Sequence, residues 1–274
     1  MKNKLGVMQG RLVPKYQGNY QAFPVGYWTD EFFIAEKLGL DLIEFILDYN
    51  DAELNPLLRD DGIEQIKFLM QQTGVFVESI CADYFMQAPL HSENLNTAQS
   101  SVRVLKRLIN NAAALKITDI VIPCVDASSL KTASSQERLV TALNEMTLTI
   151  ETANINLCLE TDLSPPLFFN LLDQLPSKNV TVNYDIGNSA SLGFDPEEEI
   201  KYYGHRITDV HIKDREFAGN SVLLGKGASR FKTVFSLLAA ANYEGPFIMQ
   251  AYRDDEGLDL FKKQFEYIKV LFHG

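Results

Sequence analysis

Cysteine and histidine are scarce in this sequence, which has three Cys and four His among 274 residues. The cysteines, Cys81, Cys124 and Cys158, are odd in number and lie in apolar runs. Such cysteines are typical of reduced, buried thiols and not of a disulfide framework. None of their spacings resembles a zinc knuckle, so a fold built on disulfides or on a Cys-rich zinc module is excluded.

Long apolar runs are absent as well. No run approaches the roughly 20 residues that a membrane-spanning helix needs. The apolar segment after the N-terminus is broken at once by Gly10-Arg11 and is too short for a signal peptide. We therefore expect a cytoplasmic protein that has no membrane partner.

Positive charge is in deficit, because 25 Lys and Arg face 36 Asp and Glu and give a formal net charge of −11. The basic residues do not cluster along the chain, and a net acidic surface repels phosphate backbones. Nucleic acid is therefore excluded as a partner. Hydrophobic residues make up 46% of the chain, enough for a buried core, so a disordered protein is excluded too.

The pattern of elements is regular. Eight short β-branched or apolar runs predict strands over residues 4–9, 41–47, 75–81, 118–124, 156–160, 180–185, 207–213 and 247–252. Amphipathic segments between them predict helices over residues 30–38, 61–72, 98–115, 135–153, 166–175, 196–203, 230–241 and 257–271. Residues 11–28 hold Pro, Gly and aromatic residues and predict a long loop.

Strict alternation of strands and helices predicts right-handed crossovers and a parallel sheet. Eight units of about 34 residues each fit a single (β/α)8 TIM barrel. A doubly wound open sheet is the alternative, but no GxGxxG or P-loop motif opens the first helix. Since no linker or break in composition appears, we expect one α/β domain over residues 1–274.

The ends of the predicted strands carry polar groups. In a (β/α)8 barrel the C-terminal strand ends form the active-site face. In chain order these residues are Gln9, Glu44, Cys81 with Asp83, Cys124 with Asp126, Glu160, Asp185, His211 with Lys213 and Asp214, and Gln250. An ordinary buried strand would end on Val or Ile instead. The face is therefore expected to carry the chemistry.

Strands five to eight bring Glu160, Asp185, His211 and Gln250 to this face. Each residue alone is more often a hydrogen-bonded structural group. A carboxylate at a buried strand end, however, is costly unless it is paired or bound to a metal. Two carboxylates, an imidazole and an amide oxygen together predict a site for a divalent metal ion, Mn²⁺, Mg²⁺, Co²⁺ or Zn²⁺.

Several stretches around these residues have a familiar sequence. They are Ala35-Glu36-Lys37-Leu38-Gly39-Leu40-Asp41-Leu42-Ile43-Glu44, Cys158-Leu159-Glu160, Tyr184-Asp185-Ile186-Gly187-Asn188, Val210-His211-Ile212-Lys213-Asp214, Leu224-Gly225-Lys226-Gly227 and Tyr243-Glu244-Gly245-Pro246-Phe247. The chain thus resembles the sugar phosphate isomerase/epimerase group of xylose isomerase-like barrels. It is similar in particular to L-ribulose or L-xylulose 5-phosphate 3-epimerases.

The resemblance implies a metal held by a Glu, an Asp, a His and a second Glu on strands five to eight. The first three positions fall on Glu160, Asp185 and His211, whereas the fourth falls on Gln250 and departs from the family pattern. Epimerases of the family also often carry a His after strand three, where this chain has Asp83-Tyr84-Phe85-Met86. The implied enzyme is an isomerase acting on a small-molecule sugar or sugar phosphate.

The implied reaction proceeds through a cis-enediolate, with Glu160 as the base. Epimerisation also needs a catalytic group on the opposite face, which the family takes from strand eight. Gln250 can coordinate a metal but cannot carry a proton at neutral pH. Either another acid serves that face, with Glu44, Asp83 and Asp214 as candidates, or the reaction is an aldose–ketose isomerisation that needs one base.

Substrate contacts are expected from charged residues near the strand ends. Barrels often bind phosphate in the loops after strands seven and eight, and an arginine after strand one can bind an oxyanion. The candidate substrate-binding residues are Arg11, Glu44, Asp83, Lys213, Asp214, Arg215, Lys226 and Arg253.

Two other functions stay open for this chain, and a third is excluded. A metal-dependent dehydratase of an inosose or keto acid also begins with proton abstraction beside a carbonyl. A barrel that binds sugar without catalysis would explain Gln250 as a lost catalytic acid. DNA-repair endonucleases of the same superfamily need more histidines and a basic face, which this chain lacks. Pairing of barrels into a homo-oligomer is left open.

Overall fold

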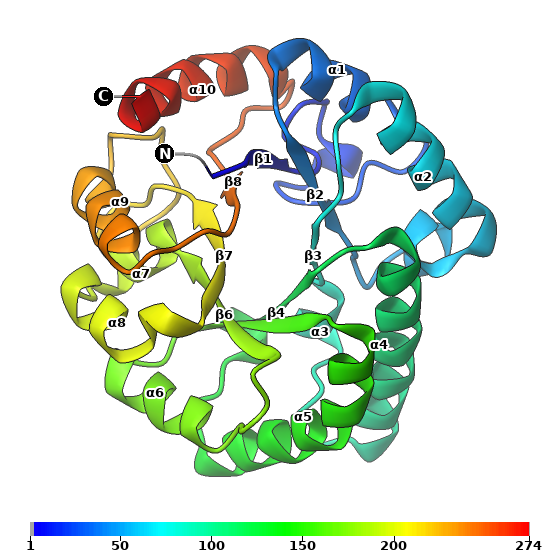
Figure 1. The fold of residues 1–274 in the computed structure, drawn as a ribbon, viewed down its shortest axis with the longest axis vertical. Helices are drawn as coiled ribbons and strands as arrows, with labels where there is room; N and C mark the ends of the chain where they lie inside the picture. Colours follow the sequence, from blue (N-terminus) through cyan, green and yellow to red (C-terminus); the bar gives the residue numbers. More distant parts are fainter. Residues whose placement is uncertain (1–2, 274) are drawn as a thin grey trace.

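Eight parallel strands close into a barrel in the order of the sequence, as Figure 1 shows along the barrel. The structure is a computed structural model that describes residues 3–273, without the side chain of His273. The strands are Leu5–Met8 (β1), Leu42–Ile46 (β2), Ser79–Cys81 (β3), Asp119–Cys124 (β4), Asn156–Thr161 (β5), Val180–Asp185 (β6), Ile207–Ile212 (β7) and Phe247–Met249 (β8). The predicted single (β/α)8 TIM barrel is confirmed.

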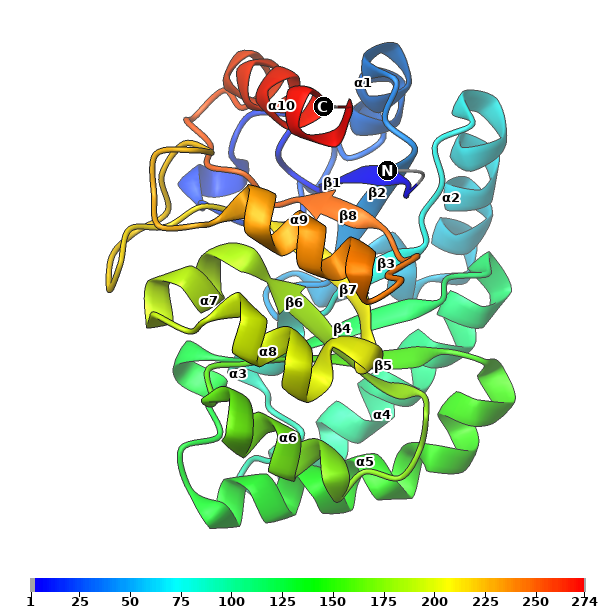
Figure 2. The same ribbon diagram turned by 60° about the vertical axis from the view of Figure 1, so that its left-hand side comes forward.

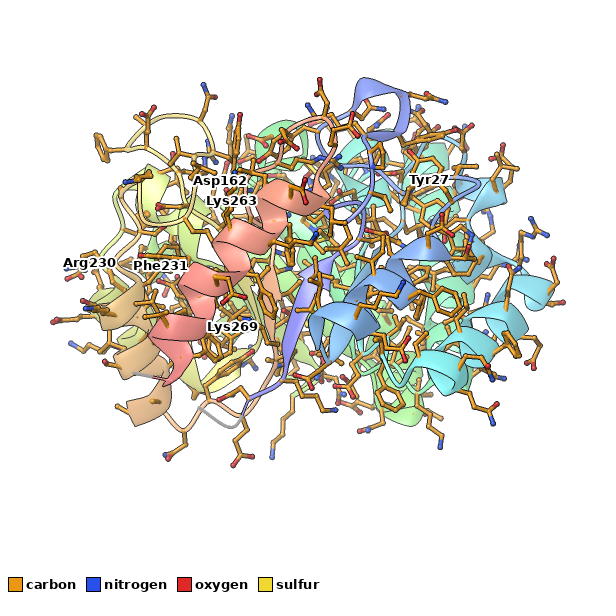
Figure 3. The ribbon with its side chains drawn as sticks, turned by 90° about the horizontal axis from the view of Figure 1, so that it is seen from above. Tyr27, Asp162, Arg230, Phe231, Lys263 and Lys269 are labelled. Atoms are coloured by element: carbon orange, nitrogen blue, oxygen red, sulfur yellow. The ribbon has the colours of Figure 1, made fainter. Side chains whose placement is uncertain are left out.

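Helices form a ring outside the strands (Figures 1 and 2). They are Asp30–Leu38 (α1), Asp60–Thr73 (α2), Tyr84–Gln87 (α3), Leu95–Leu115 (α4), Ala133–Ala153 (α5), Pro165–Asp173 (α6), Ile186–Leu192 (α7), Pro196–Tyr203 (α8), Phe231–Ala240 (α9) and Leu258–His273 (α10). Figure 3 shows the barrel from the side, with Tyr27 of the loop after β1 in the upper half and Lys269 of α10 in the lower half. No helix among the described residues is both long and apolar enough to cross a membrane.

Helix ends follow local sequence signals. Thr132 and Ser135 form a capping box at the start of α5, and Pro196 opens α8 beside the Asp195 cap. Gly39 and Gly74 end α1 and α2 with positive φ values, a conformation that glycine adopts at no steric cost. These caps define where the helices begin and end.

The predicted elements differ from the observed ones in two places that matter for the site. β8 ends at Met249, so Gln250 lies just beyond the strand, and its backbone N–H donates to the Ile212 carbonyl at the end of β7. The short helices α3 and α7 were not predicted. The α7 segment consists mostly of small and polar residues and has no apolar stripe, so its sequence pattern does not indicate a helix.

Gly6 in β1 lies where the barrel wall is crowded. A Cβ at this position would lie 2.7 Å from Ile248 Cδ1 and 2.8 Å from Leu42 Cβ. We expect Gly6→Ala to lower the free energy of unfolding by about 1–3 kcal/mol, because the added methyl overpacks the core. Urea denaturation measures this change. The control Leu148→Ala removes a side chain that is 77% exposed and should change stability by less than about 0.5 kcal/mol; equal effects of the two substitutions would contradict the packing argument.

Candidate active site

Three of the predicted ligands lie together at the C-terminal ends of neighbouring strands. Glu160, Asp185 and His211 each offer a ligand atom within 4.8 Å of the others. The parallel register pairs Asp185 with His211, and His211 Nδ1 is 4.0 Å from Asp185 Oδ2. All three side chains are buried. Two carboxylates and an imidazole at these separations suit a divalent cation.

The imidazole of His211 is oriented by Glu44. His211 Nε2 is 2.8 Å from Glu44 Oε1, and the other Glu44 oxygen accepts a hydrogen bond of 2.5 Å from Ser79 Oγ. With the proton on Nε2, the Nδ1 lone pair accepts a hydrogen bond of 3.1 Å from Asn183 Nδ2 and lies on the side of Asp185. A carboxylate supports a ligating histidine in this way in other metal sites. Glu44 is completely buried. In the structure this carboxylate supports the imidazole, and its contact with substrate stays a prediction.

Gln250 presents an amide oxygen that the protein leaves unsatisfied. Its Nε2 donates to Gln21 Oε1 at 2.9 Å. Its Oε1 is buried and has no hydrogen-bond partner among the described residues. A buried polar atom of this kind calls for a partner, and a cation would supply one. The side chains present therefore fit the divalent ion that the strand ends predict.

A second set of candidate ligands lies deeper in the barrel. Glu44, Asp209 and His211 also bring ligand atoms within 4.8 Å of one another, and all three are completely buried. In this set His211 Nε2 is hydrogen-bonded to Glu44, and both carboxylate oxygens of Asp209 lack a partner among the described residues. Burial, and next the charge of Glu44, raise the pKa of Asp209 well above its usual range, which favours a neutral carboxyl. Of the two sets, the one with Glu160 and Asp185 lies at the strand ends that form the active-site face of a barrel.

The electrostatics of the site favour proton exchange near neutral pH. Burial, and next the charge of Asp185, raise the pKa of Glu160 to about 7 against the opposing effects of His211 and Lys213. A general base works best when its pKa is near the working pH. Glu160 therefore has the properties that a carbon-proton abstraction requires.

Three buried carboxyl groups are expected to make the free energy of unfolding depend on pH. Burial raises the pKa values of Glu31, Glu44 and Glu160 from 4.5 to about 7. The folded chain holds protons that the unfolded chain releases, so the free energy of unfolding of the cation-free protein should fall as the pH rises from about 4.5 to about 7. A cation favours ionised Glu160, so Mn²⁺ should raise the melting temperature more at pH 8 than at pH 5.5. Thermal melting with chelator or with Mn²⁺ measures both effects; an equal increment at the two pH values would contradict this prediction.

Asn188 is a site residue that sequence reasoning did not select, although it lies in the Tyr184–Asn188 stretch that carries the resemblance. Its Nδ2 donates to Glu160 Oε1 at 2.5 Å, and its backbone N–H donates to Asp185 Oδ1 at 2.8 Å. Arg215 in turn donates to Asn188 Oδ1 at 2.9 Å. Asn188 therefore fixes the positions of both carboxylates of the candidate metal site.

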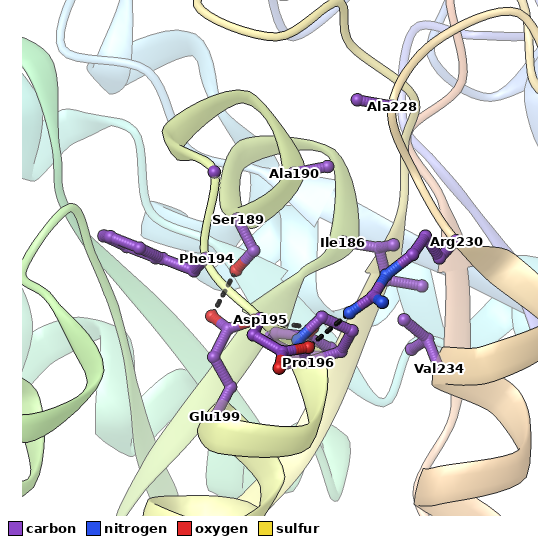
Figure 4. A pocket seen from close by; sticks show the side chains of 12 residues that line it. Ile186, Ser189, Ala190, Phe194, Asp195, Pro196, Glu199, Ala228, Arg230 and Val234 are labelled. Carbon is purple, nitrogen blue, oxygen red and sulfur yellow. Dashed lines mark hydrogen bonds and ion pairs between the residues drawn. The ribbon is translucent and has the colours of Figure 1, made fainter.

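The helix α7 that carries Asn188 is tied to the outer layer (Figure 4). Ser189 donates to Glu199 at 2.6 Å, and the hydroxyls of Tyr184 and Tyr203 also donate to this buried carboxylate, at 2.8 Å each. Arg230 pairs with Asp195 at the rim of the same cavity, which has a volume of about 320 Å³. None of the three clustered ligands lines this cavity, so it is distinct from the candidate active site.

The basic residues predicted to contact substrate divide into two groups. Lys213 Nζ is 3.4 Å from Asp185 Oδ2, and Arg215 contacts Asn188, so both reach the site. Gly187 permits the close approach of α7, since a Cβ there would lie 2.8 Å from Lys213 Cγ. Lys226 is exposed on the loop after β7 and lies outside this cluster of contacts.

Asp214 and Arg253 hold loops in place, and their contacts with substrate stay predictions. The buried Asp214 carboxylate accepts hydrogen bonds from the backbone N–H groups of Gly225, Gly227 and Ser229 at 2.8–3.0 Å. The Arg253 guanidinium donates to backbone carbonyls of the loops after β1 and β8. These hydrogen bonds tie both side chains to the backbone of their loops.

Arg11 has a similar supporting role, and its contact with a substrate oxyanion stays a prediction. It is 1% exposed, and it donates to the carbonyl of Ala251 at 3.0 Å and to Gln21 Oε1 at 2.9 Å. Gln21, which lies in the long loop after β1 and was not selected from the sequence, donates through Nε2 to Asp83 Oδ2 at 2.7 Å. Gln250, Gln21 and Asp83 thus form one hydrogen-bonded chain from β8 to β3.

Comparison with known proteins gives a consistent result. L-ribulose-5-phosphate 3-epimerase UlaE of Escherichia coli is 24% identical over 245 residues, which cover 85% of this chain and 86% of that protein. Apo 3-keto-D-glucoside 4-epimerase YcjR from E. coli has a TM-score of 0.77 at 16% identity, covering 98% of this chain and 100% of that one. The IOLI protein with a zinc atom has a TM-score of 0.77 at 15% identity, covering 98% and 97%.

These structural likenesses support the barrel, and the sequence match extends the likeness to sugar epimerases, which are isomerase-type enzymes. The family model that describes the xylose isomerase-like TIM barrel matches residues 32–271. This range begins in α1 and includes β2 to β8, together with the cluster of Glu160, Asp185 and His211. The chain belongs to the xylose isomerase-like TIM barrel family.

Proposed function

We propose that this protein is a divalent-metal-dependent epimerase of a ketose or ketose phosphate, with Glu160 as a base. The observation that carries the proposal is the buried Glu160 carboxylate beside Asp185 and His211. The similarity to L-ribulose-5-phosphate 3-epimerase over most of both chains supports the substrate class. The zinc atom in the IOLI structure supports a barrel that binds a divalent cation but does not choose among Mn²⁺, Mg²⁺, Co²⁺ and Zn²⁺.

The chain's own groups define the first half of the reaction. Glu160, Asp185, His211 and Gln250 would hold the cation, which supplies a positive charge that stabilises negative charge on the substrate oxygens. Ionised Glu160 takes the proton from the carbon beside the carbonyl, and the electron pair moves toward the carbonyl oxygen. Asn188 holds Glu160 in position through its 2.5 Å hydrogen bond. Lys213 and Arg215, which contact Asp185 and Asn188, provide positive charge for a substrate oxyanion beside these residues.

The test is a screen of ketoses with and without phosphate, starting with L-ribulose 5-phosphate, in deuterated water with added Mn²⁺ or Mg²⁺. We expect the C3 epimer to form and to carry deuterium at C3. No conversion and no exchange with any ketose or aldose would overturn the proposal.

A one-base aldose–ketose isomerase is the second candidate function, because the Gln250 amide cannot carry a proton. In the same screen it would convert a ketose to an aldose, with exchange at C1 and none at C3. A dehydratase would instead release an unsaturated or deoxy keto product. A non-catalytic sugar-binding barrel would gain activity from Gln250→Glu. A cytoplasmic location, the lack of a nucleic-acid partner and a homo-oligomer stay predictions from the sequence.

A further inference from the structure

Epimerisation needs two proton-transferring groups, one on each face of the reacting carbon. Glu160 is one of them under the proposed function, on which this inference rests. The Gln250 amide carries no titratable proton, so the second group must come from elsewhere in the site. The structure limits where it can be.

Most buried acids near the site are already committed. Glu44 is bonded to His211 and Ser79, and Asp214 accepts three backbone N–H groups of its loop. Glu31 accepts the backbone N–H groups of Gly10 and Leu12. Asp209 lies completely buried below the imidazole. All four side chains are completely buried, which separates them from a bound sugar.

Asp83 differs from them in position and exposure. It is half-buried directly after β3, on the active-site face of the barrel. Its Oδ2 accepts a hydrogen bond of 2.7 Å from Gln21, which itself accepts one of 2.9 Å from Gln250. Two hydrogen bonds therefore separate Asp83 from the residue at the position where the related epimerases carry their second carboxylate.

The partners of Asp83 also suit a group that exchanges a proton. Its Oδ1 accepts from the Cys81 thiol at 3.2 Å, and burial, followed by the charge of Asp83, raises the pKa of this thiol so that it stays a donor. The Arg11 guanidinium, bonded to Gln21, supplies a nearby positive charge when Asp83 is ionised.

We infer that Asp83 is the second catalytic acid and base and acts on the face opposite to Glu160. In one direction, Glu160 removes the C3 proton, the electron pair moves toward the carbonyl oxygen, and protonated Asp83 returns a proton to C3 from the other face. Glu160 ends protonated and Asp83 ionised, and exchange with water restores both. In the reverse direction the two residues exchange roles.

The experiment uses the ketose on which the wild type acts, starting with L-ribulose 5-phosphate, and its 3-epimer, each incubated in deuterated water with Mn²⁺. We expect Asp83→Asn to slow interconversion by about 100-fold or more. It should keep deuterium exchange at C3 in the epimer that Glu160 deprotonates and lose exchange in the other epimer. Glu160→Gln should show the opposite pattern. The control Asp162→Asn removes a carboxylate that follows β5 and is bonded to Ser129, and it should stay within about twofold of the wild type.

Asp83→Asn that interconverts the epimers at the wild-type rate would overturn the inference. So would equal loss of exchange from both epimers in a variant whose circular dichroism and Mn²⁺ affinity match those of the wild type. Failure of the proposed function has a different signature, because it appears in the wild type itself as absence of C3 exchange from every ketose tested.

Discussion

Replacing Glu160 by glutamine is expected to lower turnover by about 1,000-fold or more while the protein stays folded. Glutamine keeps the shape of the side chain and removes its capacity to accept the carbon proton, and general base catalysis typically contributes 10²- to 10⁴-fold. The loss of a charged metal ligand adds to this effect. Steady-state rates with saturating Mn²⁺ measure it.

The melting temperature of Glu160→Gln shows whether the variant loses activity because it lacks the base or because it is unfolded. Burial disfavours the ionised Glu160 carboxylate, as its raised pKa of about 7 indicates. At pH 8 without divalent cations, Glu160→Gln should therefore melt at the same temperature as the wild type or higher. An active variant would remove Glu160 as the base. An inactive variant with a much lower melting temperature would show that Glu160 serves the fold instead.

The second large effect concerns the cation. We expect Asp185→Asn to weaken Mn²⁺ binding by more than the 10- to 100-fold that loss of an outer-shell partner typically costs. The asparagine keeps the Oδ1 atom that accepts the Asn188 N–H at 2.8 Å, so the start of α7 stays capped. Isothermal titration calorimetry of the cation-free protein at pH 8 measures the change.

Asp209→Asn is the matched control, because Asp209 is also a buried strand aspartate and belongs to the deeper set with Glu44 and His211. Its substitution should leave Mn²⁺ affinity within about 10-fold of the wild type. The reverse outcome, with Asp209→Asn abolishing binding and Asp185→Asn retaining it, would move the cation to the deeper set.

The sequence predicted the barrel and the clustered ligands because both depend on local patterns. Short β-branched or apolar runs locate the strands, and a charged residue that ends such a run, as Glu160 and Asp185 do, stands out against the Val or Ile expected there. Since the C-terminal ends of parallel strands meet on one face, three such ends were enough to predict that Glu160, Asp185 and His211 lie together.

The supporting residues could not be predicted in the same way. Whether a polar side chain after a strand binds substrate or satisfies backbone groups depends on loops folded far away in sequence. Arg253 bonds carbonyls of the loop after β1, about 240 residues earlier. Gln21 lies in a long loop without periodicity, and α7 with Asn188 has no apolar stripe. Their roles appear only when these segments are placed side by side.

We propose that a divalent cation is held on the active-site face by Glu160, Asp185, His211 and Gln250 together. Anomalous diffraction from a crystal grown with Mn²⁺ at pH 8 tests this most directly. We expect one strong peak for Mn²⁺ next to carboxylate oxygens of Glu160 and Asp185, His211 Nδ1 and Gln250 Oε1. A peak between Glu44 and Asp209, or no peak in the barrel at saturating Mn²⁺, would contradict it.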